Sequence, residues 1–591
     1  MFTFLGLLAV LLPFSMLPVR SVPEIIWWLV FSVMFICAQC LVKSEKVLEN
    51  LSKIFVILTA GFGVASIYNF TRVGLTAYMR LDGIIGTHNI YGGFLIIPFF
   101  LSIYLIVKEE KRWQKYIWLL SGAIIFSSII LTFSRGTWVS IVVAIIVGVG
   151  VLLKIPRHST QPRGIGFAHG TPFFKGGFLF GIPWDKARSL RGLTLLIFII
   201  FTVLMTGGIW LAAKHSTIAN NSTQITKTAV FSNEDGESNA FTARLHYFSD
   251  ALQTYTHSPI VGFGAGNYAY ALRMYKIDPN YGSFADPHNW LLKMLVEDGL
   301  IVTIIFVGFI ISLFWQMRQL IVKRKEIPWL AVAVFTGLIG GTIHGLMDFD
   351  WSINLLLLVF FVFAGALYGY LLNTQELDVE DQGGEINGNP GIQYFPKWTQ
   401  YILVALVLIS AVISIQLFRA DLARAKGDVY LSQLNDTDSA INSYFESVLL
   451  NKYEPATWYD LWRAYFIRKN YRVAIDSINK TIALFPQSGM YYTALAQTEE
   501  AMGDFTNYRE TLLKAIKYFP ASDLTSQVNL VNFDFKQKKY DEALALIDQV
   551  LPIYTHYQSV LWFSSDPNSE MISKNLVILN DIKNRIRKIQ N

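Results

Sequence analysis

Arginines and histidines stand beside the apolar blocks of this sequence in a pattern suited to binding phosphate and moving a proton. Arg135 lies with Ser134 in a short turn between two apolar blocks, and Arg244 opens an amphipathic stretch. His288 and Asn289 directly precede another apolar block. A guanidinium binds phosphate oxygens in pairs and stays charged, and a histidine near neutral pKa can take a proton from a hydroxyl. Together these residue types predict attack by an alcohol on a substrate that carries phosphate.

Two further polar groups adjoin apolar blocks. Arg80 is followed by Gly86-Thr87-His88-Asn89, and His344 is followed by Asp348 and Asp350. Ionisable residues in or beside a membrane span are costly and rare, so they are candidates for function. We therefore include Asn89 with Arg80 among the candidate substrate-binding residues, together with Ser134 and Asn289, and we keep His344 and Asp348 as secondary candidates.

Each candidate arginine also has a structural interpretation. Arg80 could anchor the chain at the membrane interface, and Arg135 could extend its side chain to the lipid headgroups. Arg244 lies in a long polar loop, where an arginine is usually solvated. The functional interpretation rests on the combination, because all three are expected at one membrane face.

The histidines and the acids have structural interpretations too. His288 could make a structural hydrogen bond at a helix start. His344 and Asp348 are four residues apart on one helical face, which fits a structural pair as well as a catalytic one. Glu297 could orient the site, but we favour a pair with Lys293, one turn earlier.

Two motifs resemble known sites but lack the context these need. Gly262-x-Gly264-x-Gly266 is similar to a dinucleotide fingerprint, yet no strand precedes it and no βαβ unit follows, so we interpret it as a bend. Cys37 and Cys40 have a CxxC spacing inside an apolar block, where nothing could complete a zinc site. We expect both to be core thiols. We expect no bound metal and no cofactor.

The elements that must position these residues are membrane spans. The chain has 591 residues, of which 53% are hydrophobic and 16% charged, whereas soluble domains have about 25% charged residues. A bilayer core needs roughly 20 apolar helical residues, and about eleven blocks approach that length. These blocks are 2–19, 22–42, 53–69, 91–107, 116–132, 136–153, 192–213, 292–315, 328–346, 352–373 and 399–418.

Basic loops predict the orientation of these spans. Short loops rich in Lys and Arg stay in the cytoplasm, and such loops occur near 43–53, 108–115, 154–191 and 318–325. All four fall on one side if the N-terminus is cytoplasmic. The opposite, outer side then receives every candidate residue. The net charge of +6 belongs to these loops, so we expect no nucleic-acid binding.

The C-terminal part has the composition of a soluble helical domain. Phe485-Pro486 recurs as Phe519-Pro520, and Ala440 recurs as Ala474. This spacing of about 34 residues is the tetratricopeptide period, although an ordinary helical bundle remains an alternative. Such a solenoid usually binds a protein partner. The predicted fold is all-α: a membrane domain over 1–375, an acidic, Gly-rich linker over 376–398, a last span at 399–418, and repeats over 419–591.

The order of these motifs resembles the O-antigen ligase and polymerase superfamily over roughly 60–375. The resemblance is carried by Ser134-Arg135-Gly136 between spans, Arg244 in a large outer loop, the Pro259 to Gly266 bend, and His288-Asn289 before Leu292. The Arg80 to Asn89 segment is similar too, but His88 stands where relatives often have Pro before Asn. After Arg244, Tyr247 or Phe248 stands where relatives often have Trp.

The resemblance implies a membrane glycosyltransferase of the GT-C type in the bacterial cell membrane. Its donor would be a glycan on undecaprenyl pyrophosphate, and its acceptor a glycan or lipid-glycan hydroxyl outside the cytoplasm. Such enzymes are thought to need no metal. In this hypothesis His288 is the general base, while Arg135 and Arg244, with a weaker contribution from Arg80, hold the leaving pyrophosphate.

Other functions remain open. Ligase, polymerase and protein O-oligosaccharyltransferase share this architecture, and nothing in the sequence separates them. A lipid-linked glycan flippase is the alternative from another class, but it predicts charged residues along a central path and inverted repeats. Our candidates instead gather at one face. A scaffold anchored in the membrane would need one span only.

Overall fold

A computed structural model shows an all-helical protein. It describes residues 2–73, 80–83, 87–155, 198–209, 240–275, 286–324, 326–380, 397–486, 488–518, 524–560 and 567–590. Helices dominate these segments, which contain no extended strand. The expected linker falls mainly on 381–396, and much of the expected outer loop also lies outside the described residues.

Seven of the described helices are long and apolar enough to cross a membrane. They are α2 (Pro18–Leu41), α3 (Glu45–Val73), α4 (His88–Lys108), α5 (Arg112–Thr132), α6 (Arg135–Leu152), α11 (Trp290–Val322) and α13 (Asn354–Glu380). Three expected blocks form shorter apolar helices: Thr3–Phe14, Phe198–Ile209 and Trp329–Gly345, the last of which is α12. The expected span 399–418 is part of α14 (Lys397–Ser432).

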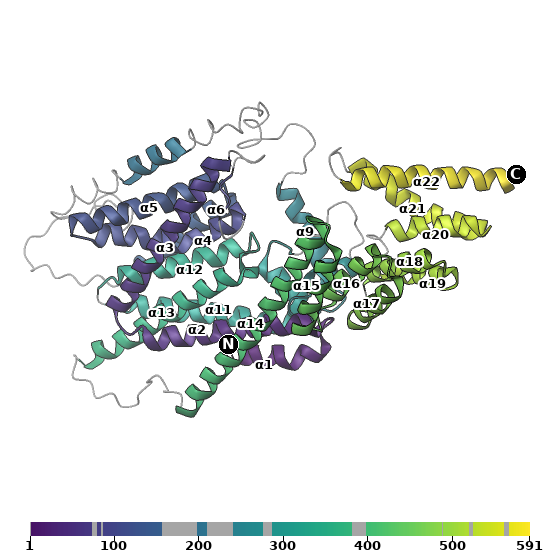
Figure 1. Cartoon of the computed structure of the whole chain (residues 1–591). Helices are drawn as coiled ribbons and strands as arrows, with labels where there is room; N and C mark the ends of the chain where they lie inside the picture. The colour runs from purple at the N-terminus through teal and green to yellow at the C-terminus, as the bar shows by residue number, and fades with distance from the viewer. Residues whose placement is uncertain are drawn as a thin grey trace, which may run out of the picture.

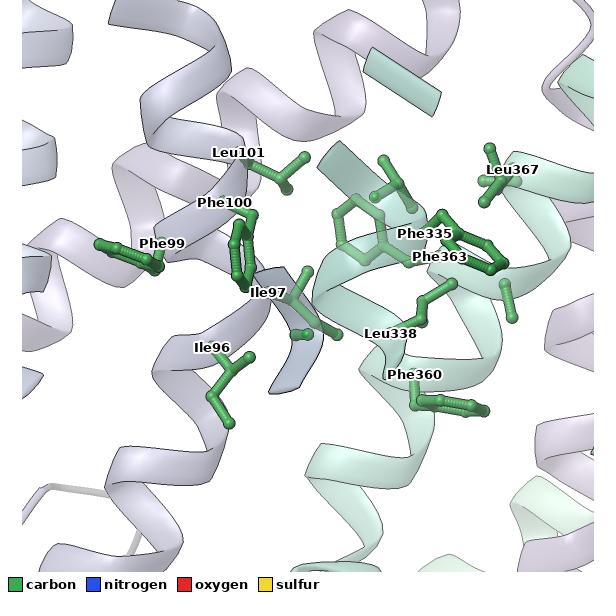
Figure 2. Packing of buried hydrophobic residues seen from close by; sticks show 14 of the residues in the cluster. Ile96, Ile97, Phe99, Phe100, Leu101, Phe335, Leu338, Phe360, Phe363 and Leu367 are labelled. Carbon is green, nitrogen blue, oxygen red and sulfur yellow. The ribbon is translucent and has the colours of Figure 1, made fainter. Parts of the chain in front are cut away.

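The helix α4 lies at the centre of the bundle. In its most apolar stretch, 89% of the residues are buried. It packs against α5 and α12, and α12 packs in turn against α6 and α13. Figure 2 shows Ile97 and Phe100 of α4 near Phe335 and Leu338 of α12. Helices in a bilayer associate mainly through such packing, because lipid tails are as apolar as the side chains.

The helices α2 and α13 approach each other at two glycines. A methyl group on Gly365 or Gly369 would lie 2.1 Å from the carbonyl oxygen of Phe35 or Gln39. Small residues four positions apart allow this close approach of membrane helices. The expectation for Cys37 and Cys40 on α2 is wrong, because both thiols are exposed on the outside of the bundle.

Consecutive antiparallel helices form the C-terminal part, and Figure 1 shows most of them beyond one end of the bundle. After α14 they are α15 (Thr437–Leu450), α16 (Pro455–Ile467), α17 (Tyr471–Leu484), α18 (Gly489–Met502), α19 (Phe505–Tyr518), α20 (Leu524–Lys536), α21 (Tyr540–Val560) and α22 (Pro567–Gln590). Each helix contacts the next along the chain, as in a solenoid. The tetratricopeptide assignment itself stays a prediction.

The solenoid contacts the start of the bundle directly. Leu17, just before α2, is buried in one cluster with Trp462 and Ile478. Arg20 donates to Glu454 over 2.6 Å. These contacts fix the first helix pairs of the solenoid against the bundle.

Candidate active site

Asp348 joins two of the three residues that we assigned to catalysis. It follows the end of α12 and its side chain is only 2% exposed. One carboxylate oxygen lies 3.1 Å from His288 Nδ1, and the other accepts from Arg244 Nη2 over 3.4 Å. Asp348 thus connects α9 (Ala240–Tyr255), which carries Arg244, to the residue before the start of α11.

The local backbone and its neighbours hold His288 in a defined orientation. Its φ of 55° is left-handed, which is uncommon for a residue other than glycine. Its backbone N–H donates to Asp286 over 2.9 Å. Its ring stacks on Tyr247 with centroids 5.5 Å apart and meets the edge of Phe349 at 4.9 Å. If Nδ1–H is donated to Asp348, Nε2 carries the basic lone pair.

Asn289 caps a helix beside the candidate base. Its side-chain oxygen accepts from the backbone N–H of Leu292 over 3.0 Å, which caps the start of α11. Its amide nitrogen donates to the carbonyl of Leu346 over 2.9 Å. An N-cap of this kind is worth about 0.5–2 kcal/mol. Asn289 therefore ties the start of α11 to the turn that carries Asp348.

The charges around Asp348 favour its ionised form. Burial alone would raise the pKa of this carboxyl, but the hydrogen bond from His288 and the charges of His288 and His344 lower the pKa below its usual range. A lowered carboxyl pKa means that Asp348 stays negative at neutral pH. It can therefore orient His288 and stabilise the positive charge that a general base acquires.

His344 belongs to a second polar cluster, and its interaction with Asp348 is electrostatic, without a side-chain hydrogen bond in the structure. Its Nδ1 hydrogen-bonds Asp350, and its Nε2 lies 3.1 Å from Thr137 Oγ1. The backbone N–H of Asp348 donates to the carbonyl of His344 over 3.0 Å, one turn along, but the two side chains have different partners. His344 is fully buried, which suits a structural role.

The turn before α6 brings Ser134 and Arg135 beside this second cluster. Ser134 is buried and caps α6, because its hydroxyl accepts from the N–H of Thr137 over 3.4 Å. A methyl group on Gly136 would lie 3.3 Å from His344 Nε2. Arg135 is the first residue of α6 and is exposed. It therefore stands at the same end of the bundle as Asp348.

Arg80 and Asn89 lie at the start of α4. Arg80 Nη1 lies 3.0 Å from His88 Nε2, and Asp82 accepts from the backbone N–H of His88 over 2.7 Å. The charge of Asp348 also acts on His88. Asn89 is the second residue of α4 and is half-buried. This segment is therefore part of the same polar face.

Glu297 lies away from His288, against the glycine bend. Its carboxylate accepts from the N–H of Tyr268 over 3.1 Å. Gly262, Gly264 and Gly266 all have positive φ, so the expected bend is confirmed. Glu297 interacts electrostatically with Lys293, whose ammonium donates to Ser352 over 2.9 Å. Glu297 therefore supports the bend and does not contact the candidate base.

Sequence reasoning missed two contributors. Asp286 holds the backbone of His288 and also contacts Ser352, and its position two residues before His288 was the available signal. Thr137 contacts His344, and no spacing rule links residues so far apart. Among the described residues, no group of three His, Cys, Asp or Glu side chains could hold a metal ion.

Comparison with known proteins identifies a family match for part of the chain. Residues 120–307 match the family model described as O-antigen ligase. This segment contains the Ser134-Arg135 turn, Arg244, the glycine bend and His288. No curated protein matched the chain. Residues 120–307 of this multi-pass helical protein thus match an O-antigen ligase domain, which supports a relation to the O-antigen ligase superfamily.

Proposed function

We propose that this protein transfers a glycan from an undecaprenyl-pyrophosphate donor to an acceptor hydroxyl outside the cytoplasm. The O-antigen ligase domain supports a glycosyltransferase-like role in polysaccharide assembly. The observation that carries the finer proposal is the contact of Asp348 with both His288 and Arg244. It brings a candidate base and a candidate phosphate ligand to one point.

In this proposal the reaction is a direct displacement at the anomeric carbon. His288 Nε2 takes the proton of the acceptor hydroxyl, while Asp348 orients the ring through Nδ1. The acceptor oxygen forms a bond to the anomeric carbon as the bond from that carbon to the pyrophosphate oxygen breaks. Positioned proton transfer of this kind contributes about 10²–10⁴ in rate.

The arginines stabilise the leaving pyrophosphate. Arg244 contacts Asp348 through one nitrogen at 3.4 Å, a long contact that a phosphate oxygen could compete with. Arg135 is exposed at the start of α6, where the helix dipole also favours an anion. A preorganised donor aimed at a developing anion is worth on the order of 10²–10³ in rate. Arg80 and Asn89 would line the donor site, and the buried Ser134 would hold the turn that carries Arg135.

Charges at the other end of the bundle favour the proposed orientation. Lys108, which ends α4, is bound by Glu45 and Glu49. His88, at the opposite end of the same helix, belongs to the candidate site. With the Lys/Arg-rich loops in the cytoplasm, the candidate site faces outward. Arg20 and Glu454 are in contact, which favours the solenoid on that outer side too.

A transfer assay tests the proposal. Purified protein in liposomes is mixed with an undecaprenyl-pyrophosphate glycan and a glycan acceptor, with chelator and without nucleotide sugar. We expect the glycan to move to the acceptor and the lipid pyrophosphate to be released. The assay also separates ligase from polymerase and protein oligosaccharyltransferase, according to the acceptor that is used. Movement of intact lipid-linked glycan across the bilayer without transfer would favour a flippase.

A further inference from the structure

A cavity of about 380 Å³ lies at the junction between the bundle and the solenoid. This volume is within the range of about 300–1,000 Å³ that is usual for small-molecule sites. The bundle side contributes Arg20 of α2 and Tyr270 of α10 (Tyr268–Tyr275). The solenoid contributes all of the remaining lining residues, including Arg424, Tyr459, Asp460, Arg463, Phe485 and Tyr491.

The charged part of the wall is predominantly cationic. It contains three guanidinium groups and one carboxylate, Asp460. Arg424 donates to Asp460 over 2.6 Å. Arg20 pairs with Glu454 at 2.6 Å, and Arg463 pairs with Asp428 at 2.8 Å. Neither of these two acids lines the cavity.

These arginines are not fully satisfied by their protein partners. The Nε atoms of Arg20 and Arg463 are buried, and neither has a hydrogen-bond partner among the described residues. The charges of Arg20 and Arg424 also repel each other. A buried donor without a partner is costly. An anion in the cavity would pair with the guanidinium groups that line it and offset the repulsion between them.

Aromatic rings form much of the remaining wall. Tyr459 and Tyr491 have ring centroids 5.5 Å apart, and Tyr270 meets Phe485 edge-on at 4.9 Å. The guanidinium carbon of Arg20 lies 5.8 Å from the centre of the Tyr270 ring. Tyrosine offers an apolar face together with a polar hydroxyl. This combination suits a ligand with apolar C–H faces, hydroxyl groups and an anionic substituent.

We propose that this cavity binds an acidic sugar residue of a glycan, with its carboxylate on the arginines and its ring against the tyrosines. The inference rests on the proposed function, which supplies a glycan as substrate. A phospholipid headgroup shares the anionic chemistry. The sugar is favoured because most of the wall comes from the solenoid and not from the apolar helices of the bundle.

The helices α10 and α11 link the wall of the cavity to the candidate active site. Tyr270 lines the cavity, while Tyr268, at the start of the same helix, donates its N–H to Glu297 of α11. His288 and Asn289 directly precede α11. A glycan held in the cavity would therefore be retained on the face of the protein where transfer is proposed. This arrangement gives the solenoid a role in holding the glycan chain.

Direct binding to the full-length protein in detergent tests the inference. The probes are trigalacturonate, which is acidic, and maltotriose, which is neutral, each measured by titration calorimetry. We expect trigalacturonate to bind and maltotriose to bind at least tenfold more weakly, since charge-assisted hydrogen bonds from arginine are lost. Equal affinity for the two probes would overturn the inference.

Two matched variants locate the binding. Arg463→Gln removes a guanidinium from the wall. Its pair with Asp428 is about 40% exposed on both sides, so the loss of that pair costs little stability. Because Arg463 also contacts Tyr444 and Asp460, the unfolding temperature of the variant is compared with that of the wild type. We expect the variant to bind trigalacturonate about tenfold or more weakly. Arg468→Gln is the control, because Arg468 directly follows α16, the helix that carries Arg463, pairs with exposed Asp438 and does not line the cavity. Unchanged binding by Arg463→Gln, or an equal loss in both variants, contradicts the inference.

Further measurements distinguish an acidic sugar from a phosphate ligand, and this inference from the proposed function. Inorganic phosphate or phosphatidylglycerol vesicles that displace trigalacturonate at comparable concentration would identify a general phosphate site and overturn the sugar assignment. Arg244→Ala should bind trigalacturonate like the wild type, because Arg244 lies outside the cavity; a loss there overturns the assignment. Binding without glycan transfer would contradict the proposed function alone, and transfer without binding would contradict this inference alone.

Discussion

Asp348 Oδ1 lies 3.1 Å from His288 Nδ1, although the two residues are 60 positions apart in the chain. The same carboxylate contacts Arg244. A carboxylate on Nδ1 fixes the tautomer in which Nε2 can accept a proton. The geometry therefore makes Asp348 the residue that positions the candidate base, a role that the sequence had not separated from a structural one.

Replacing Asp348 by Asn tests this positioning role. The amide keeps a similar shape but loses the charge that stabilises a protonated His288. We expect the rate of glycan transfer to fall on the order of 10²-fold or more, with little change in the affinity for the donor. Steady-state kinetics measures the two effects separately. Asp438→Asn, an exposed acid of the solenoid, is the control, and equal rates for both variants would argue against the role.

His344→Ala should damage stability more than chemistry. His344 is fully buried against Asp350, and removing one partner of a buried pair costs about 3–5 kcal/mol. We expect a clearly lower unfolding temperature in detergent, with most of the transfer activity retained per folded molecule at low temperature. If His344→Ala is inactive while folded and His288→Ala transfers glycan, the wrong histidine has been assigned as base.

Arg135→Lys keeps the positive charge and removes the planar fork. We expect this variant to lose most transfer activity, because an ammonium cannot bind two phosphate oxygens in the same way. Arg112→Lys is a matched control, since Arg112 begins α5 as Arg135 begins α6 but lies at the opposite end of the bundle. Rates are compared at saturating acceptor. Wild-type transfer by Arg135→Lys would remove this arginine from the mechanism.

Cysteine labelling in intact cells tests the orientation of the protein. In a background without Cys37 and Cys40, single cysteines replace Asp235, Glu500 or Thr160. We expect a membrane-impermeant maleimide to reach the first two from outside, and the third only after permeabilisation. The physical reason is the position of the Lys/Arg-rich loops. Labelling at position 235 only after permeabilisation would place the candidate site on the wrong side of the membrane.

The sequence predicted the membrane helices well because each depends on local composition. Apolar run length is a property of one segment, so the blocks that became α4, α5 and α13 could be identified directly. Helix caps are local too, and Ser134 and Asn289 both cap the helices that they precede. The family resemblance that rested on the order of these motifs is confirmed for residues 120–307.

Pairings between distant segments could not be obtained in the same way. The spacing of His344 and Asp348 placed the two residues one helical turn apart, but their side chains have different partners: His288 for Asp348 and Asp350 for His344. No periodicity predicts which residue of a distant segment a side chain contacts. The cavity at the junction combines Arg20 with Arg463, and only the packing of the solenoid on the bundle brings such residues together.

The most direct test of the central claim is glycan transfer by His288 and Arg244 variants. The assay uses purified lipid-linked glycan and acceptor in liposomes, with chelator and without nucleotide sugar. His288→Ala is paired with His288→Asn, because asparagine tolerates the left-handed backbone at this position; His257→Ala, an exposed histidine, is the control. We predict that His288→Ala, His288→Asn and Arg244→Ala each lose about 10²-fold or more of the transfer rate while the protein still inserts and accumulates. Full activity of both His288→Ala and Arg244→Ala would contradict the mechanism.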